Sequence, residues 1–225
     1  MLQRHFYTAG LAVYITLALG LDPRMYFESL LAANALTDEL GLPSVRLSPP
    51  TARSYLSDPT FMPKVASLLN IDEPEELVVK CNIVSQIVCE AISNELSCGA
   101  YLTIGDVVFS GKPFFNVDEM YVRSLVAGGK RSLAAQGYRH HAWITLDSME
   151  IIDFTMNTSM AMLSKDLSPV VRKQMLGGIV AGHADRLKGG VSYHPVLIGE
   201  AFYLEYDTAY PMLKAIYVAG LAAKP

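Results

Sequence analysis

Apolar residues recur at intervals of three and four in two long stretches of the chain. Residues 24–40 follow this helical spacing, and Gly41 supplies the end of the predicted helix. Residues 82–96 repeat the pattern, which predicts a helix buried on one face with Cys81 at its start. Between the two helices, a proline-rich stretch predicts a surface loop followed by a short helix near residues 64–70.

A third apolar run, Tyr7–Leu21, lies close to the N-terminus and follows Arg4 and His5. It contains no A-x-A-like cleavage site. It is also shorter than the about 20 apolar residues that a membrane span requires. These features favour a buried core helix, with a signal peptide or a membrane anchor as the alternatives.

Strand-like segments follow the predicted Cys81 helix. Residues 100–109, AYLTIGDVVF, are rich in β-branched and aromatic side chains. The segments HAWITL and IIDFT predict two further strands, joined by a turn in which Asp147 is a hairpin residue. Residues 167–182 and 208–224 are predicted to be helical, and residues 196–206 to form a strand. Because strands and helices are segregated rather than alternating, the order indicates an α+β fold.

Length and composition are those of one globular unit. The 225 residues are 51% hydrophobic and 18% charged, which suits a single domain over residues 1–225. We expect an N-terminal helical layer at about 1–70, a core at about 71–160, and C-terminal helices with a strand at about 161–225. The formal charge of −4 and the absence of a run of Lys and Arg interleaved with aromatic residues argue against a nucleic-acid partner.

The three cysteines fit neither a disulfide framework nor a zinc site, because their number is odd and no Cys/His ligand spacing is present. We therefore expect a reducing, cytoplasmic location, with secretion by a non-classical route as the alternative. No metal, no cofactor and no membrane partner are predicted.

An aspartate interrupts the second strand of the predicted hairpin. Asp153 lies between Ile152 and Phe154, and an aspartate is seldom buried without a partner. A histidine on the neighbouring strand is the obvious partner. His140 and His141 are adjacent there, so their side chains point to opposite faces and only one of them can meet the aspartate.

The order of these features resembles the transglutaminase-like, papain-related superfamily. The matching pieces are Cys81 at the start of a helix, a strand, HAWITL with His141, and IIDFT with Asp153, over about residues 76–158. The resemblance implies a papain-like core in which the nucleophile opens a helix packed on an antiparallel sheet, with extra helices at both ends. It selects His141 rather than His140, and it makes Cys81, His141 and Asp153 the catalytic triad.

Cysteine chemistry suits these positions. A thiol is mostly protonated at neutral pH, and a helix N-terminus together with an imidazolium favours the thiolate. His141 would act as general base, and Asp153 would orient its ring. The backbone N–H of Cys81 could form part of an oxyanion hole. Cys89, in mid-helix, and Cys98, between helix and strand, are predicted to be structural.

We therefore predict a cysteine-dependent hydrolase that cleaves an amide, peptide or related acyl bond through a thioester. Trp143 and Tyr138 are the predicted substrate-binding residues, and the substrate is expected to be a peptide, a protein or a small amide. An acyltransferase, a transglutaminase, a deamidase and a non-catalytic binding protein of the same fold are the alternatives. Residues 111–139 form either a functional lid or a surface helix from Asp118 to Leu125 with a solvated turn.

Overall fold

The computed structural model describes residues 7–8, 11–15, 24–69, 74–78, 80–131, 133, 139–165 and 167–222. Its helices and strands, in chain order, are β1 (Tyr7–Thr8), β2 (Leu11–Ile15), α1 (Arg24–Glu39), α2 (Phe61–Ser67), η1 (Pro74–Leu77), α3 (Cys81–Glu95), β3 (Ala100–Phe109), β4 (Lys112–Pro113), α4 (Glu119–Ala127), β5 (His141–Leu146), β6 (Glu150–Asp153), α5 (Met156–Leu163), α6 (Pro169–Met175), β7 (Ile179–His183), η3 (Ala184–Arg186), β8 (Val191–Ile198), α7 (Ala201–Tyr206) and α8 (Tyr210–Ala222).

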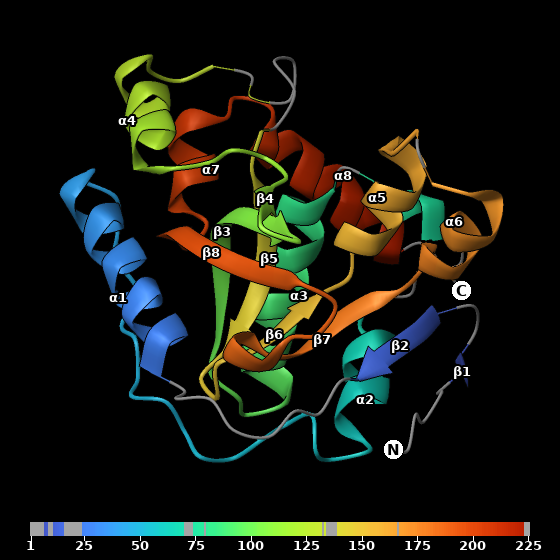
Figure 1. The fold of residues 1–225 in the computed structure, drawn as a ribbon. Coiled ribbons are helices and arrows are strands. Elements are labelled where there is room, and N and C mark those ends of the chain that lie inside the picture. The colour runs from blue at the N-terminus through green and yellow to red at the C-terminus, as the bar shows by residue number, and fades with distance from the viewer. Residues whose placement is uncertain are drawn as a thin grey trace.

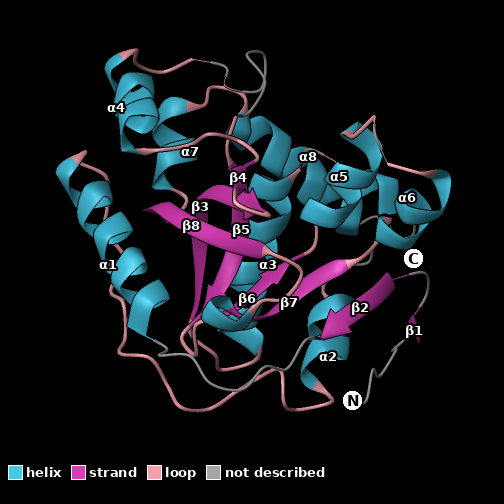
Figure 2. Ribbon diagram, viewed as in Figure 1, coloured by secondary structure: helices cyan, strands magenta, loops and turns pink. Residues whose placement is uncertain are grey.

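The described strands form one curled sheet with helices around it (Figures 1 and 2). The strand order is β1-β2-β7-β6-β5-β3-β4, and β8 also pairs with β3. All of these pairs are antiparallel except β2 with β7, which is parallel. The mixture of separate helices with a mainly antiparallel sheet is an α+β arrangement.

Two apolar clusters fill the two sides of the sheet. The first contains Val84 and Val88 of α3 together with Ala142 and Ile144 of β5, because α3 packs along that strand (Figure 1). The second contains Tyr26 and Leu30 of α1, which lies beside β8, together with Trp143 of β5. Alternate residues of β5 therefore enter different clusters, as the period of two in a strand requires.

Several predicted elements are confirmed with nearly the predicted bounds. The helix expected at residues 24–40 is α1, the helix that begins at Cys81 is α3, and the strand AYLTIGDVVF is β3. The predicted hairpin is the antiparallel pair β5–β6. The surface helix expected from Asp118 is α4, in which Asp118 is the N-cap and accepts a hydrogen bond from the Tyr121 backbone N–H.

Other predictions are wrong. The described parts of Tyr7–Leu21 are strands rather than a helix, and β2 pairs with β7, so the region expected to be a helical layer contributes to the sheet. Residues 179–182, expected to continue a helix, belong to β7, because their β-branched residues fit a buried sheet position. The strand expected at residues 196–206 ends at Ile198, and α7 follows. The short helix α2 begins at Phe61, three residues before the expected start.

No helix in the described part of the chain combines the length and the apolar character that a bilayer crossing requires.

Candidate functional site

The three predicted triad residues lie at the ends of three neighbouring elements. Cys81 is the first residue of α3, His141 is the first of β5, and Asp153 is the last of β6. Because β5 and β6 are antiparallel, the start of one and the end of the other share one end of the hairpin. The Ser85 hydroxyl donates to the Ala142 carbonyl at 3.0 Å, which fixes the N-terminal part of α3 against the start of β5.

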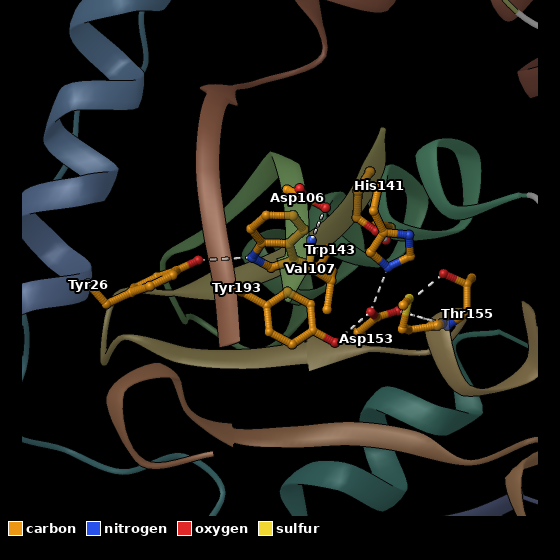
Figure 3. A network of polar contacts seen from close by, with 11 residues as sticks. Tyr26, Asp106, Val107, His141, Trp143, Asp153, Thr155 and Tyr193 are labelled. Carbon is orange, nitrogen blue, oxygen red and sulfur yellow. Dashed lines mark hydrogen bonds and ion pairs between the residues drawn. The ribbon is translucent and has the colours of Figure 1, made fainter. Parts of the chain in front are cut away.

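His141 and Asp153 form a buried pair. Nε2 of His141 lies 2.6 Å from Oδ2 of Asp153, and the two residues are 1% and 0% exposed (Figure 3). With Nε2 occupied by the carboxylate, Nδ1 is the ring nitrogen left to interact with the Cys81 side chain, which raises the pKa of His141. The structure thus places His141 between the sulfur and the carboxylate.

Asp153 accepts four further hydrogen bonds. Its Oδ1 receives the Thr155 backbone N–H at 2.9 Å, the Thr155 hydroxyl at 3.1 Å and the Met156 backbone N–H at 3.0 Å. Its Oδ2 receives the Tyr193 hydroxyl at 2.8 Å. Every partner is a donor, so the surroundings favour the ionised carboxylate. Asp153 both orients His141 and begins the turn that leads into α5.

The charges of the site stabilise one another. Burial alone would lower the pKa of His141, but the Asp153 carboxylate and the Cys81 side chain raise this pKa to about 10. Burial alone would raise the pKa of Asp153, but His141 and the surrounding donors hold it below the usual range for a carboxyl. The favoured state at neutral pH is therefore an imidazolium beside a carboxylate.

The raised pKa of His141 predicts a free energy of unfolding that falls at high pH. Below the ordinary histidine pKa of about 6.5, His141 is protonated in both the folded and the unfolded chain, so its full contribution is present. Between about 6.5 and 10, only the folded chain keeps this proton. The free energy of unfolding should therefore fall by about 1.4 kcal/mol per pH unit across this window, which urea unfolding at several pH values would measure.

The control for this pH dependence is His141→Gln, which removes the titrating ring and should flatten the decline above pH 6.5. An equally steep decline in the variant would show that another group is responsible.

Aromatic rings enclose the imidazole of His141. The Phe115 ring stacks on it with centroids 5.3 Å apart and planes at 4°, and the Trp143 ring lies 6.2 Å away at 22°. Trp143 itself is 0% exposed, and its indole N–H donates to the Tyr26 hydroxyl at 2.9 Å (Figure 3). Trp143, which was predicted to bind substrate, therefore lies beside His141 and has no exposed surface of its own. The other predicted substrate-binding residue, Tyr138, lies outside the described residues.

A second buried carboxylate, Asp106 of β3, holds the segment that carries Phe115. Asp106 Oδ1 accepts the backbone N–H groups of Val107 at 2.8 Å and of Phe115 at 2.9 Å. Its Oδ2 accepts the Val117 N–H at 3.4 Å. These bonds connect the sheet to the chain after β4, and they keep the Phe115 ring against His141.

The remaining cysteines are placed differently. Burial raises the pKa of Cys89 to about 12, and burial likewise raises the pKa of Cys98 to about 12. Both thiols therefore stay protonated at neutral pH and pack as small apolar groups in the first cluster.

The neighbouring histidine belongs to the other face of β5. His140 packs beside Phe202 and Tyr203 of α7, and burial lowers its pKa to about 3. His140 is thus neutral at physiological pH, whereas His141 faces the carboxylate. The alternation along the strand separates the two rings as the sequence predicted. His194 is exposed and lies on β8.

Sequence reasoning missed Phe115 and Tyr193, which contact His141 and Asp153, and it missed Asp106 and Tyr26, which bind Phe115 and Trp143 instead. Thr155 ends the segment IIDFT that carries Asp153, and its two hydrogen bonds to Asp153 give the spacing of these two residues a physical reason. Asp106 carries the same signal as Asp153, an aspartate within an apolar strand, whereas no such signal accompanies Tyr26, Phe115 and Tyr193.

Within the described ranges, no group of three or more His, Cys, Asp and Glu side chains is arranged to hold a metal ion. Comparison with protein-family models, with curated proteins and with solved structures finds no match to this chain.

Proposed function

We propose that this protein is a cysteine-dependent hydrolase of an amide, peptide or related acyl bond, with Cys81 as nucleophile, His141 as general base and Asp153 as the orienting carboxylate. The observation that carries the proposal is the position of His141, which is bound through Nε2 to a buried carboxylate and lies close enough to the Cys81 side chain for that group to raise its pKa. The transglutaminase-like, papain-related core remains part of this proposal. Its support is the helix that begins at Cys81 and packs on β5 and β3 of the antiparallel sheet.

In the proposed reaction, the Cys81 thiolate attacks the carbonyl carbon and its electron pair moves to the carbonyl oxygen. The tetrahedral intermediate collapses, the bond to the leaving group breaks, and His141 donates its proton to the departing amine. A thioester to Cys81 remains. His141 then takes a proton from water, the resulting hydroxide adds to the thioester, and the carboxylic acid product leaves the thiolate. An amine in place of water would give acyl transfer instead.

The oxyanion of the intermediate requires hydrogen-bond donors, and Asn82 is the proposed second donor beside the Cys81 backbone N–H. Its Oδ1 accepts the Ile83 backbone N–H at 2.9 Å. Because the N–H groups of a first helical turn point toward the N-terminal end, this bond holds the carboxamide at the end of α3 that carries Cys81. Asn82 is 2% exposed, and no atom of the described residues accepts from its Nδ2. A buried donor left unpaired in this way is costly, which suits a group that is used in the reaction.

We expect Asn82→Ala to lower acyl turnover by roughly 10²–10³, the loss typical of removing one oxyanion donor. Alkylation of Cys81 by iodoacetamide should stay unchanged, because that reaction forms no oxyanion. Steady-state turnover and alkylation rates of the same preparation would measure both.

The matched control is Gln86→Ala, which deletes another buried carboxamide one turn along α3. Gln86 donates to Glu90 at 2.7 Å, so its loss should leave turnover unchanged. Equal losses in the two variants would remove Asn82 from the oxyanion site.

The proposed function is tested by trapping its acyl-enzyme. Incubation with p-nitrophenyl acetate should release nitrophenol and add one acetyl group to Cys81, which peptide mass spectrometry would locate. Hydroxylamine should remove the acetyl group, because thioesters react with it readily. Adding a primary amine would show whether amine competes with water for the acyl group. Absence of the adduct on Cys81 would contradict the proposal.

A second candidate function, a non-catalytic protein that retains the triad for structure, is favoured by one observation. Cys81, His141 and Asp153 are only 8%, 1% and 0% exposed. In that case Cys81 would form no acyl adduct, and its replacement would change stability alone.

A further inference from the structure

We infer that Tyr193 is a positioning residue of this site, whose hydroxyl fixes the Asp153 oxygen that binds His141. The inference rests on the proposed function and adds a fourth side chain to it. Figure 3 shows the Tyr193 hydroxyl and the His141 ring converging on Asp153. Both bonds end on Oδ2, at 2.8 Å from the Tyr193 oxygen and 2.6 Å from Nε2 of His141.

The sheet brings Tyr193 to this position. Tyr193 lies on β8, opposite Val107 of β3, and its ring packs edge-on against Trp143 with centroids 4.9 Å apart. A bulge in the β3–β8 pairing falls between Ile104 and Gly105. A Cβ on Gly105 would overlap the His194 carbonyl oxygen of β8 and crowd the Trp143 ring. Glycine at this position therefore allows the close approach of β8 that places Tyr193 beside Asp153.

Tyr193 can act only as a donor here. Burial and the adjacent carboxylate raise its pKa well above the usual tyrosine range, so its O–H stays protonated at every working pH. The carboxylate of Asp153 has no proton to give in return. A neutral donor on Oδ2 stabilises the charged form of Asp153 without competing for the proton of His141. It also fixes the direction from which Oδ2 can accept the imidazole N–H.

The test compares two buried tyrosines whose hydroxyl groups have different hydrogen-bond partners. Tyr193→Phe removes the donor to Asp153, whereas Tyr26→Phe removes a buried hydroxyl that bonds Trp143 and Thr145 instead. Both variants lose one oxygen from a packed ring. The rate of Cys81 alkylation by iodoacetamide would be measured from pH 4 to 9 in each variant and in the wild type, together with the melting temperature.

In Tyr193→Phe, the Asp153 carboxylate loses a hydrogen bond and should take up a proton at a higher pH. The pH at which acid suppresses Cys81 alkylation should therefore rise by about one to two units, because a hydrogen bond to a charged group shifts its pKa by about that much. Tyr26→Phe should lose comparable stability and keep the wild-type profile. A profile of Tyr193→Phe that matches the wild type, an equal shift in both variants, or failure of Tyr193→Phe to fold would overturn the inference.

Failure of the proposed function would look different, because Cys81→Ala would then leave labelling unchanged. The inference would still be tested by NMR, which follows the signal of the Asp153 carboxyl carbon during an acid titration. A higher titration midpoint in Tyr193→Phe than in Tyr26→Phe would support it. Equal midpoints would overturn it.

Discussion

Replacement of Cys81 by alanine should abolish both the rapid labelling of this protein by iodoacetamide below pH 8 and its acyl turnover. Loss of the nucleophile in a triad enzyme costs a factor on the order of 10⁶ in turnover, because no other group can form the covalent intermediate. The physical reason lies in the pair that Cys81 forms with His141, whose raised pKa keeps an imidazolium beside the sulfur. Alkylation kinetics and turnover of p-nitrophenyl acetate would measure the two losses.

The matched controls are the other two cysteines. Cys89→Ala and Cys98→Ala should keep labelling and turnover, because burial raises the pKa of both thiols to about 12 and holds them protonated. Loss of the labelling signal in Cys98→Ala instead would mean that the nucleophile has been misassigned.

The second large effect is expected for Asp153→Asn. The amide oxygen of the introduced side chain can replace Oδ1 and keep the hydrogen bonds from Thr155 and Met156. The NH₂ group of that side chain would replace Oδ2. That group would donate to Nε2 of His141, so the ring would be a neutral imidazole with its proton on Nδ1 and could no longer take the Cys81 proton or form the imidazolium beside the sulfur. Turnover should fall by up to about 10⁴, the loss expected when a triad carboxylate no longer selects the tautomer.

Stability alone cannot decide the role of Asp153, because this side chain both orients His141 and binds the turn before α5. Thr155→Val is the matched control, since it removes one donor to Oδ1 and leaves Oδ2 untouched. Both variants should lower the melting temperature, and only Asp153→Asn should slow turnover and Cys81 labelling. A lowered melting temperature with unchanged Cys81 reactivity in Asp153→Asn would exclude a catalytic role.

The sequence by itself determined the local elements of the site. Helical spacing after Cys81, alternation around His141 and the turn before Asp153 are short-range properties, and the structure contains α3, β5 and β6 where they were predicted. The lone aspartate in an apolar strand also predicted a buried histidine partner. That prediction held because an unpaired buried carboxylate is too costly to be retained.

Only the tertiary structure decided what surrounds the pair. Tyr193 is 40 residues from Asp153 along the chain, and Tyr26 is 117 residues from Trp143, so no local pattern connects them. The same limit explains the N-terminal run, whose apolar residues suit a helix or a strand equally until β7 supplies a partner for β2. Local spacing determines which elements form. Pairing between distant strands determines which side chains meet, because a contact across the sheet depends on register and not on sequence distance.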